Sequence, residues 1–427
     1  MNIGWITVGI LLVAAILTLR FFRSLAFTAW VLVGVSAAFF FPAAFQTWWG
    51  LPLASLIVPL IQLIMFGMGT TLNLGDFLRI VKEPWPVLLG ISLQYAVMPI
   101  TGYMLVVAFG LEGELAAGVI LIGACSGGVA SNVMSYIGNG NVALSVTMTA
   151  FSTIVAPVMT PLAMTVLAGQ YIDVDAFAML IGVVNIVIAP VFAGVVGNAI
   201  LYSKKPWCQR TGTLLGVAAM LVAVGTAIAL VPADQLGAFN ALRNCVSLGL
   251  YLIAALAIVK VIFLARGSDN EAWLDRGLPI LSMAGICAIL TVLTAQTHDV
   301  LVQAAGVLFA AAVIHNTIGL SLGYWGARVV GVLAGRIGFR IGMFPNSQPR
   351  LTERDCRTVA FEVGMQNGGM ATGLAINVLH SHVVALPPNV FGTWMHISGS
   401  ILANYWKRDS SPEESPATVT SLEAELA

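Results

Sequence analysis

Charged residues are scarce in this chain of 427 residues: Lys and Arg number 19, Asp and Glu number 19, and together they make up 9% of the sequence. A soluble domain carries about 25% charged residues, so the composition excludes an ordinary water-facing surface. The two signs balance to a formal net charge of +0, so no basic excess indicates a nucleic-acid partner. Because 59% of the residues are hydrophobic, we expect lipid to surround most of the folded chain.

Paired cysteines and a cleavable leader are also missing. No two of the five cysteines form a CxxC or a similar pair, so we expect free thiols rather than disulfides or a zinc site. The first apolar run has no basic residue before it, whereas Arg20 and Arg23 follow it. This is the reverse of a secretory signal, so we expect a retained helix. The cysteines are Cys125, Cys208, Cys245, Cys287 and Cys356.

Long apolar runs are what the sequence contains instead. Each is long enough to cross the ~30 Å of hydrocarbon in a bilayer. The sequence therefore predicts an all-α polytopic membrane protein with about thirteen transmembrane helices. The predicted spans are residues 3–22, 26–45, 52–72, 84–109, 114–137, 141–169, 175–203, 211–232, 244–265, 277–295, 299–325, 353–380 and 386–406.

The positions of the basic residues predict the orientation. With thirteen spans and the N-terminus outside, every Lys and Arg except Arg243 falls in or beside an inner loop or the C-terminal tail. Such an excess of inner Lys and Arg is what the positive-inside rule predicts. We therefore expect a multi-pass protein of a cell membrane, a bacterial inner membrane, with a cytoplasmic C-terminus. Acidic residues border the outer loops: Glu112, Glu114, Asp173, Asp175, Asp234 and Asp299.

A five-residue motif occurs twice, as GGVAS in residues 127–131 and as GGMAT in residues 368–372. Both copies lie in the middle of predicted spans that cross the membrane in opposite directions, as in an inverted-topology repeat. Paired glycines favour unwound backbone, which is tolerated at membrane depth where it lines a protein cavity. We expect two broken helices that cross near the midplane and present half-helix N-termini to an anion and free carbonyls to a cation. Close GxxxG-like packing without unwinding is the alternative.

One acidic residue, Glu362, lies inside the span that carries the second motif. Burying a lone carboxylate in the bilayer costs ~2.5–3.5 kcal/mol, and a bound sodium ion would offset that cost. A hard cation binds several oxygens at once, and Glu362, Gln366, Ser131, Asn132 and freed carbonyls could supply them. A protonated or hydrogen-bonded structural glutamic acid is the alternative.

Other polar side chains also lie inside predicted spans. Ser145 and Thr149 share one helical face, although each could simply bond to a carbonyl of its own helix. The lone amide and the histidines could serve a transport pathway, or could form hydrogen bonds that hold helices together. These residues are Gln94, Ser145, Thr149, His315, Asn316 and His396.

The motifs resemble those of the bile acid:sodium symporter family. Residues 127–136 (GGVASNVMSY) with 140–145 (GNVALS), and residues 357–367 (RTVAFEVGMQN), resemble its two long signatures. Shorter matches occur at residues 315–325 and at residues 397–400. The similarity covers roughly residues 25–200 and 277–406.

The resemblance implies ten core helices in two inverted five-helix repeats. A core domain with two crossed discontinuous helices would move against a panel domain and hold two sodium ions. One implied sodium site contains Ser131, Asn132, Ser145, Thr149 and Glu362. The other contains Gln94, Glu362, Gln366 and the carbonyls of Val363 and Met365. The implied substrate site lies beside the crossing, at Gly128, Val129, Ala130, Asn367 and His396.

The chain also departs from the family pattern. Relatives often have Thr where this chain has Val129, and Asn is common near the position of His396, so contacts to the anion are expected to differ. The basic, Gly-rich residues 326–352 favour a linker over an amphipathic surface element. The expected parts are an extra N-terminal helix in 1–24, the first repeat and the start of the second in 25–203, an inserted helix pair in 204–276 (helices in 211–265), the rest of the second repeat in 277–406, and a disordered cytoplasmic tail in 407–427.

These features together predict a sodium-coupled symporter of a small organic anion, bile-acid-like or a short carboxylate, that works by alternating access. Its partners would be Na⁺ as coupling ion, the anion and the bilayer, with no nucleic acid and no cofactor. An oxyanion efflux carrier that uses Cys125, or a proton-coupled antiporter that uses Glu362, are the alternatives on the same scaffold. An enzyme is not expected, because no nucleophile–base pair or metal motif stands near the proposed cavity.

Overall fold

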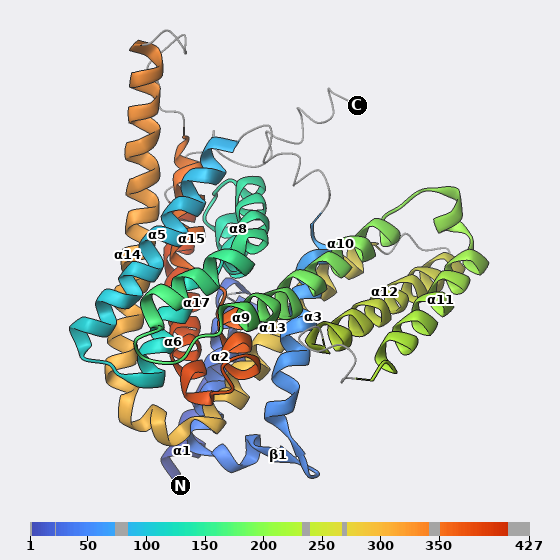
Figure 1. Ribbon diagram of the computed structural model, residues 1–427, viewed down its shortest axis with the longest axis horizontal. Helices are drawn as coiled ribbons and strands as arrows, with labels where there is room; N and C mark the ends of the chain where they lie inside the picture. Colours follow the sequence, from blue (N-terminus) through green and yellow to red (C-terminus); the bar gives the residue numbers. More distant parts are fainter. Residues whose placement is uncertain are drawn as a thin grey trace.

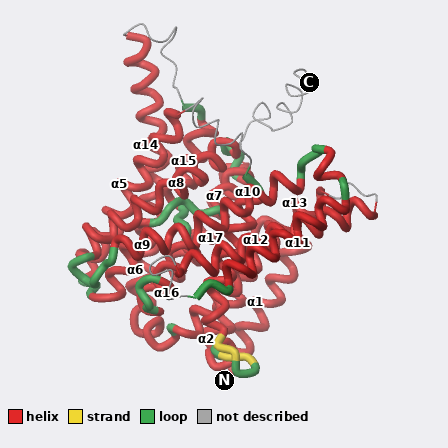
Figure 2. Tube along the Cα trace, turned by 45° about the vertical axis from the view of Figure 1, so that its right-hand side comes forward, coloured by secondary structure: helices red, strands yellow, loops and turns green. Residues whose placement is uncertain are grey.

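Helices make up nearly all of the protein in a computed structural model that describes residues 2–21, 23–72, 84–232, 240–266, 271–340 and 351–408 (Figures 1 and 2). Helices satisfy every backbone hydrogen bond within one segment, which is what a lipid environment requires. The first half contains α1 Asn2–Phe21, α2 Arg23–Phe40, the 3₁₀ helices η1 Pro42–Phe45 and η2 Leu53–Leu56, the strands β1 Thr47–Trp48 and β2 Leu51–Pro52, α3 Ile57–Thr70, α5 Pro84–Phe109, α6 Gly113–Ala124, α7 Ala130–Ile137 and α8 Val142–Ala163.

The second half continues with two π-helical turns and further α-helices. The π turns η3 and η4 directly extend α8 and α9, so each forms one continuous rod with its neighbour. The elements are η3 Met164–Ala168, α9 Ala176–Val183, η4 Val184–Ile188, α10 Ala189–Leu201, the 3₁₀ helix η5 Pro206–Gln209, α11 Thr211–Ala229, α12 Asn240–Arg266, α13 Glu271–Gln296, α14 His298–Arg340, α15 Glu353–Gly364, α16 Gly368–Asn377 and α17 His382–Arg408.

Polar side chains fix where several of these helices begin. Asn141 accepts a hydrogen bond from the Leu144 amide at the start of α8, and Asp175 caps α9 in the same way. Thr352 and Asp355 form a reciprocal capping box at the start of α15. These side chains satisfy amides that have no partner within the helix, so the sequence itself sets the helix boundaries.

Two of the predicted spans are broken at the paired glycines and cross each other, as expected. Residues 125–129 separate α6 from α7, and residues 365–367 separate α15 from α16. An antiparallel bridge pairs Gly127 with Gln366 at the crossing. The Gly128 amide donates to the Met365 carbonyl at 2.8 Å, and the Asn367 amide donates to the Ser126 carbonyl at 2.8 Å. Each broken helix thus supplies hydrogen-bond partners for the other.

Each predicted span coincides with helical segments, but several boundaries differ, most of all the end of α14. The helix predicted to end at residue 325 continues as α14 to Arg340, so residues 326–340 are helix rather than linker, and 341–350 lie outside the described residues. Its 43 residues extend over ~65 Å, about twice the thickness of the hydrocarbon layer. In Figure 1, α14 projects beyond its neighbours. Lys407 and Arg408, expected in the tail, belong to α17, and the rest of that tail is outside the description.

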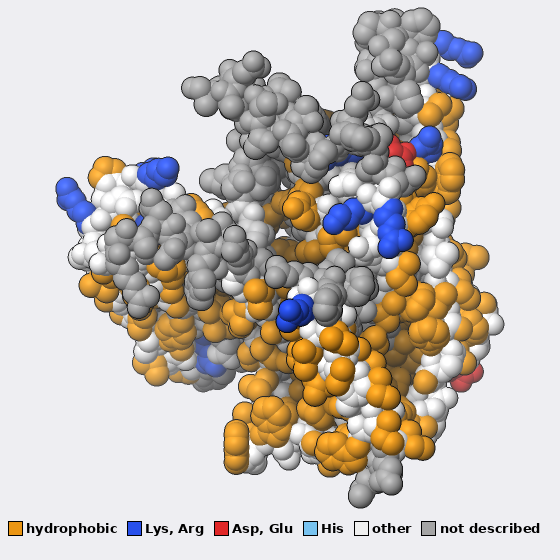
Figure 3. Space-filling model, turned by 180° about the vertical axis from the view of Figure 1, so that it is seen from behind, with side chains coloured by type: hydrophobic (Ala, Val, Ile, Leu, Met, Phe, Trp, Pro, Cys, Tyr) orange, Lys and Arg blue, Asp and Glu red, His pale blue; other side chains and the backbone are white. Residues whose placement is uncertain are grey.

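Length and hydropathy identify eight helices of the described chain as candidate membrane spans, with three shorter apolar helices besides them. The protein is therefore an all-α polytopic membrane protein, and the count of thirteen spans stays a prediction. In Figure 3 most of the visible Lys and Arg side chains lie in the upper half, and the lowest part of this face is mostly hydrophobic. This asymmetry is typical of a protein that spans a bilayer.

Two helical additions lie at the periphery. α1 packs along α2, and α11 and α12 form a hairpin that packs on α10 (Figure 1). Lys260 of α12 is buried, and its ammonium donates to the carbonyls of Ile200 at 2.8 Å and Ser203 at 2.7 Å. The cation therefore sits at the negative end of the α10 dipole, which attaches the hairpin to that helix.

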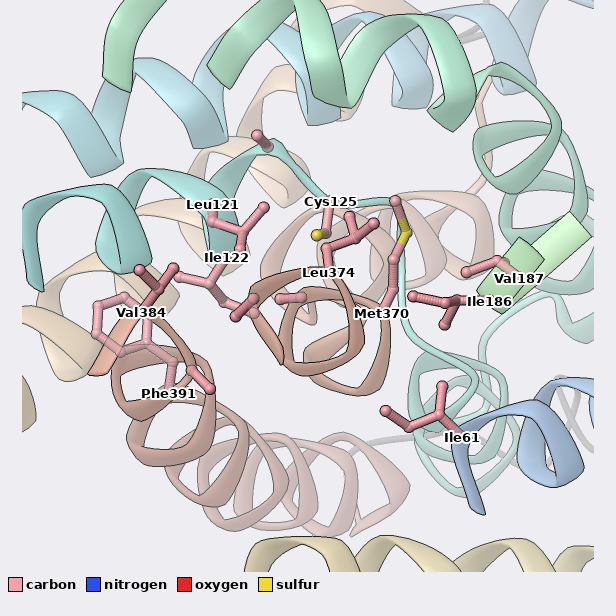
Figure 4. Packing of buried hydrophobic residues seen from close by; sticks show 14 of the residues in the cluster. Ile61, Leu121, Ile122, Cys125, Ile186, Val187, Met370, Leu374, Val384 and Phe391 are labelled. Carbon is pink, nitrogen blue, oxygen red and sulfur yellow. The ribbon is translucent and has the colours of Figure 1, made fainter. Parts of the chain in front are cut away.

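The core surrounds the second broken helix. Met370 and Leu374 of α16 are fully buried: Leu374 lies toward Ile122 of α6, and Met370 lies beside Ile186 of the η4 turn (Figure 4). On another side, α16 packs against α3 and the η4 turn. Gly373 makes this possible, because a Cβ there would lie 2.9 Å from a methyl carbon of Ile186. The short helix is thus held firmly next to the crossing.

Candidate functional site

The Glu362 carboxylate lies inside a group of side-chain oxygens from three helices. Its Oε1 accepts hydrogen bonds from the hydroxyls of Ser131 and Ser145, each at 2.5 Å. Thr149 approaches both carboxylate oxygens, at 3.0 and 2.9 Å. The Asn132 Oδ1 completes the group, 2.8 Å from the Ser145 hydroxyl and 3.2 Å from that of Thr149. These five residues were predicted to lie together, and we call them the oxygen cage.

The oxygen cage has more acceptors than donors. Its three hydroxyls carry one proton each, whereas the carboxylate and the amide oxygen carry only lone pairs. Ser145 contacts both Glu362 and Asn132, and its single proton can serve only one of them. Ser131 likewise lies 2.7 Å from the Gly128 carbonyl as well as near Glu362. A surplus of lone pairs in a buried site suits a cation with oxygen ligands.

Basic side chains do not neutralise Glu362 among the described residues, because none of the described ion pairs includes it. Arg357, on the same helix, instead donates to Glu353 at 3.3 Å and to the carbonyls of Gly138 and Trp406 at 3.4 Å. Glu353 also accepts a bond from Arg328 at 2.5 Å. The basic residues at the start of α15 are therefore engaged in a separate network. The buried carboxylate, 3% exposed, has only hydroxyl partners.

Hydrogen bonds one turn away set the register of α8 against α15. Asn141 donates two hydrogen bonds to α15: its backbone N–H donates to the Thr358 hydroxyl at 2.8 Å, and its side-chain amide donates to Asp355 at 2.8 Å. Asn141 lies one turn before Ser145, and Thr358 lies one turn before Glu362. Because the two helices are tied at this level, their next turns face each other. No separate pattern in the sequence indicates this contact.

Glycines at the crossing bring the backbone close to the carboxylate. A Cβ on Gly127 would lie 2.8 Å from Oε2 of Glu362, and a Cβ on Gly128 would lie 2.8 Å from the Gln366 carbonyl. Real Cβ atoms essentially never approach so closely, so Gly128 is fixed by a backbone carbonyl, whereas a Cβ at Gly127 would have to displace the Glu362 carboxylate. The paired glycines are therefore needed for the site as well as for the break.

The second predicted group, at Gln94 and Gln366, is also assembled. The Gln94 side-chain amide donates to the Cys125 carbonyl at 2.9 Å and contacts Oε1 of Gln366. The Gln366 amide donates to the Val363 carbonyl at 2.7 Å, and the Met365 carbonyl accepts from Gly128. Both carbonyls thus have partners, whereas Oε1 of Gln94 is buried without one.

A small cavity adjoins that unpaired oxygen. Its volume of about 10 Å³ is close to what one water-sized particle needs. Glu362 and Gln94 both line it, so the carboxylate faces the oxygen cage and this cavity together. Ser152 of α8 also lines the cavity. It was not predicted as a site residue, because a single serine in an apolar helix gives no signal that separates a ligand from an ordinary helical residue. The residues around the cavity are Gly90, Ile91, Gln94, Gly127, Met148, Ser152 and Glu362.

A larger cavity lies on the other side of the crossing. All five residues predicted to contact substrate line it: Gly128, Val129, Ala130, Asn367 and His396. Its volume is about 60 Å³, which is small beside the ~300–1,000 Å³ of pockets for drug-sized ligands. The starts of α7 and α16 border the cavity, so their partly positive ends favour an anion there. We call this space the crossing cavity.

The opposite wall of the crossing cavity is apolar. Ile61 and Met65 of α3 and Ile289 of α13 face the crossing, and none of them was predicted as a site residue. Apolar residues in an apolar chain give no sequence signal that separates a cavity wall from lipid-facing packing. The cavity thus offers one polar side built from backbone and amides and one hydrophobic side, which suits an amphipathic anion.

His396 belongs to the crossing cavity, whereas His315 and Asn316 do not line it. His315 is fully buried and bonds the Met98 carbonyl at 3.1 Å. Asn316 donates to the Gly364 carbonyl at 2.9 Å, where the broken helix α15 ends, and accepts from Ser398 at 2.6 Å. Both contacts join helices, so the geometry favours the structural reading of this pair over a proton relay.

Cysteine and transition-metal chemistry find no support among the described residues. Cys125 is fully buried and lines neither cavity at the crossing. The described part of the chain contains no group of three or more His, Cys, Asp or Glu side chains that could hold a metal. The oxygen cage, with one carboxylate, three hydroxyls and an amide, has instead the oxygen ligands that hard cations prefer.

The known proteins that resemble this chain carry the names of sodium-dependent transporters. Residues 58–236 match the model of the Sodium Bile acid symporter family, and this stretch includes the first broken helix and most of the oxygen cage. Residues 58–236 are therefore similar to a domain of the sodium bile acid symporter family. It is similar to an uncharacterized sodium-dependent transporter, YocS, of Bacillus subtilis, with 29% identity over 94% of this chain and 97% of the relative. A probable sodium/metabolite cotransporter, BASS1, of Arabidopsis thaliana chloroplasts is 29% identical over 92% of this chain and 75% of the relative.

The names of the matching family and of these relatives are those of transporters and not of enzymes. The fold has also been seen in a solved structure, the sodium proton antiporter MjNhaP1 from Methanocaldococcus jannaschii. The two structures align with a TM-score of 0.51 over 95% of this chain and 97% of the other, at 16% identity. Identity this low shows a shared fold and does not transfer the antiporter's activity.

Proposed function

We propose that the protein is a sodium-coupled symporter of a small organic anion. The observation that supports this most strongly is the oxygen cage around Glu362, because its surplus of acceptors needs a cation and it adjoins a cavity suited to an anion. Two sodium ions would bind at the crossing, one in the oxygen cage and one between Glu362 and Gln94. The names of the family and its relatives agree with sodium dependence.

The substrate would be a carboxylate that binds in the crossing cavity. Its charged end would face the starts of α7 and α16 and the Asn367 amide, and its apolar part would face Ile61 and Ile289. Val129 has no hydroxyl, so the polar contacts would come from the side chains of Asn367, Thr372 and His396 and from backbone amides. The small volume of the cavity favours a short carboxylate over a bile acid in this conformation.

Transport would follow alternating access. The helices around the crossing would form a core domain that moves against a panel domain of α2, α3, α9–α10 and α13, and the two halves of the chain would be inverted repeats. The N-terminus would be outside and the C-terminus in the cytoplasm of a bacterial inner membrane. Two sodium ions and one monovalent anion carry one net charge, which at ~100 mV provides ~2.3 kcal/mol. A tenfold sodium gradient adds ~1.4 kcal/mol per ion, so accumulation by several thousandfold is within reach.

Uptake into proteoliposomes tests the proposal. Purified protein is reconstituted, and radiolabelled short carboxylates and a bile acid are offered with an inward sodium gradient, with potassium in its place, or with a pH gradient alone. We expect sodium-driven uptake of a short carboxylate together with an inward current. Uptake that needs no sodium and follows the pH gradient would instead indicate a proton-coupled antiporter, the reading that the shared fold with a sodium proton antiporter keeps open.

A further inference from the structure

A β-hairpin with two tryptophans joins α2 to α3 at the end of the molecule that carries the N-terminus (Figures 1 and 2). β1 and β2 pair antiparallel, with Trp48 opposite Leu51. The two residues between the strands, Trp49 and Gly50, have φ of 48° and 83°. A two-residue turn with positive φ at both positions is the type I′ turn, whose first position favours Asn, Asp or Gly.

Trp49 has a backbone conformation that a bulky side chain disfavours, and its contacts with the described residues do not compensate for this. A left-handed conformation brings Cβ close to the following carbonyl oxygen, so a bulky side chain rarely adopts it. The Trp49 side chain is fully exposed, at 101%. Its described ring contact is the edge of the half-exposed Trp48, with centroids 6.4 Å apart. Packing against the described residues therefore does not explain why a tryptophan stands at this position, which favours a contact outside the protein.

The surroundings of the hairpin are aromatic and uncharged. No charged residue occurs between Arg23 and Asp76 in the sequence. Trp5 of α1 is exposed at the same end and stacks near Phe41, with ring centroids 4.4 Å apart. Leu51 and Leu56 are exposed beside the tip. A soluble protein partner or a polyanion would find no charges here, and a loop in bulk water would expose polar residues instead.

We propose that the hairpin tip, Trp48 and Trp49, is a binding surface for lipid headgroups and inserts into the interface of the bilayer. Tryptophan favours that zone because its ring is apolar and its indole N–H is a hydrogen-bond donor. The Trp48 N–H bonds the Ala44 carbonyl at 2.8 Å, so its ring is oriented by the protein. The fully exposed Trp49 indole remains for phospholipid carbonyls and phosphates.

The hairpin would fix how deep α2, α3 and α13 lie in the bilayer. Gln46, just before β1, donates to the Ala295 carbonyl at the end of α13 at 3.4 Å, and η1 and η2 both pack on α13. The tip is therefore connected to α2, α3 and α13 together. If the proposed alternating access holds, this anchored group stays at constant height while the broken helices move. The lipid contact itself does not depend on sodium or substrate.

Fluorine NMR on the full-length protein in lipid nanodiscs tests the contact. The protein is labelled with 5-fluorotryptophan, and Trp49→Phe and Trp394→Phe assign the resonances of the tip and of a tryptophan inside α17. Nanodiscs are prepared with and without a phospholipid that carries a nitroxide on its headgroup, and a gadolinium chelate is added separately as a water-soluble relaxation agent. We expect the lipid nitroxide to broaden the Trp49 signal severalfold more than the chelate does.

Broadening of Trp49 by the chelate without an effect of the lipid nitroxide would place the tip in water and overturn the proposal. Broadening by neither agent would mean that protein, such as a second copy of the chain, covers the tip, which would also overturn it.

A substitution that suits the turn provides a second readout. Trp49→Asn fits the type I′ turn, so the hairpin should fold and the protein should keep its Tm in detergent. Moving the protein from detergent into nanodiscs should raise its Tm. We expect this rise to be several degrees smaller for Trp49→Asn than for the parent. Trp85→Asn, at the start of α5 and 48% exposed, is the control for loss of any surface tryptophan. An equal gain for Trp49→Asn and the parent would contradict lipid binding by the tip.

Discussion

At the scale of single residues, the hydroxyls of the oxygen cage are placed to act as ligands rather than to bond their own helix. Thr149 points at Glu362 and Asn132, whereas Thr147 on the same helix bonds the carbonyl of Ala143, four residues earlier, at 2.7 Å. Both threonines are buried, so they have a similar degree of exposure and differ in their hydrogen-bond partners. Thr149 is therefore a candidate ligand, whereas Thr147 is an ordinary helical threonine.

Thr149→Val should weaken sodium binding by about tenfold. The change keeps the shape of the side chain and removes one oxygen, and the loss of one polar contact is worth about 1–1.5 kcal/mol. Sodium-dependent thermal stability measures the effect, as the sodium concentration that gives half of the maximal shift in Tm. Thr147→Val is the matched control and should keep the parent's value. Equal sodium dependence in all three proteins would contradict the ligand role of Thr149.

Gly392→Ala should weaken substrate binding and leave sodium binding unchanged. Gly392 lines the crossing cavity, and a Cβ built there has no atom within 4 Å, so the added methyl group would occupy space proposed for the substrate. We expect KM for the transported carboxylate to rise by about tenfold, the effect of one misfitting group.

Gly306→Ala, in α14 away from the cavity, has the same open surroundings and serves as control. An unchanged KM in Gly392→Ala would show that the substrate binds elsewhere.

At the scale of elements, the break in α6–α7 depends on the close approach of Gly127 to Glu362. Gly127→Ala should destabilise the protein by about 1–3 kcal/mol, because a methyl group there would overlap the carboxylate. We also expect the displaced carboxylate to lower sodium affinity. Thermal unfolding with and without sodium measures both effects. A variant with the parent's Tm and the parent's sodium shift would mean that the crossing is looser than the structure indicates.

The inserted hairpin α11–α12 should matter for stability and not for sodium binding. Lys260→Met removes the bonds to Ile200 and Ser203 and should lower the free energy of unfolding by about 1.5–3 kcal/mol, as for hydrogen bonds to a charged group. The shift in Tm that sodium produces should be that of the parent. Lys205→Met, at an exposed position, is the control. A lost sodium response in Lys260→Met would connect the hairpin to transport.

Elements were predictable from the sequence where local chemistry decides them. The paired glycines indicated where both breaks lie: residues 127–128 are inside the first break, and residues 368–369 begin α16 directly after the second. The end of α14 was not predictable in this way, since its glycines and arginines read as a linker although the segment continues as helix to Arg340. The π turns η3 and η4 carry no residue signal, because they arise where neighbouring helices pack.

At the scale of the whole molecule, the fold brings residues more than 200 positions apart to one site. The hydroxyls of α7 and α8 could be assigned to Glu362 through the family resemblance, while helix periodicity alone could not place α8 against α15. The apolar wall of the crossing cavity, from α3 and α13, depends on packing between distant spans and left no mark in the sequence. The orientation and the inverted repeats rest on charge and motif patterns and stay predictions.

Equilibrium binding of ²²Na⁺ to the purified protein in nanodiscs tests the central claim most directly. The comparison is between the parent, Glu362→Gln, and Glu114→Gln, which changes an exposed acid on α6. The oxygen cage predicts saturable binding to the parent and to Glu114→Gln, and at least about a hundredfold weaker binding to Glu362→Gln, because the ion loses its charged ligand. Binding to Glu362→Gln with the parent's affinity and stoichiometry would contradict the account.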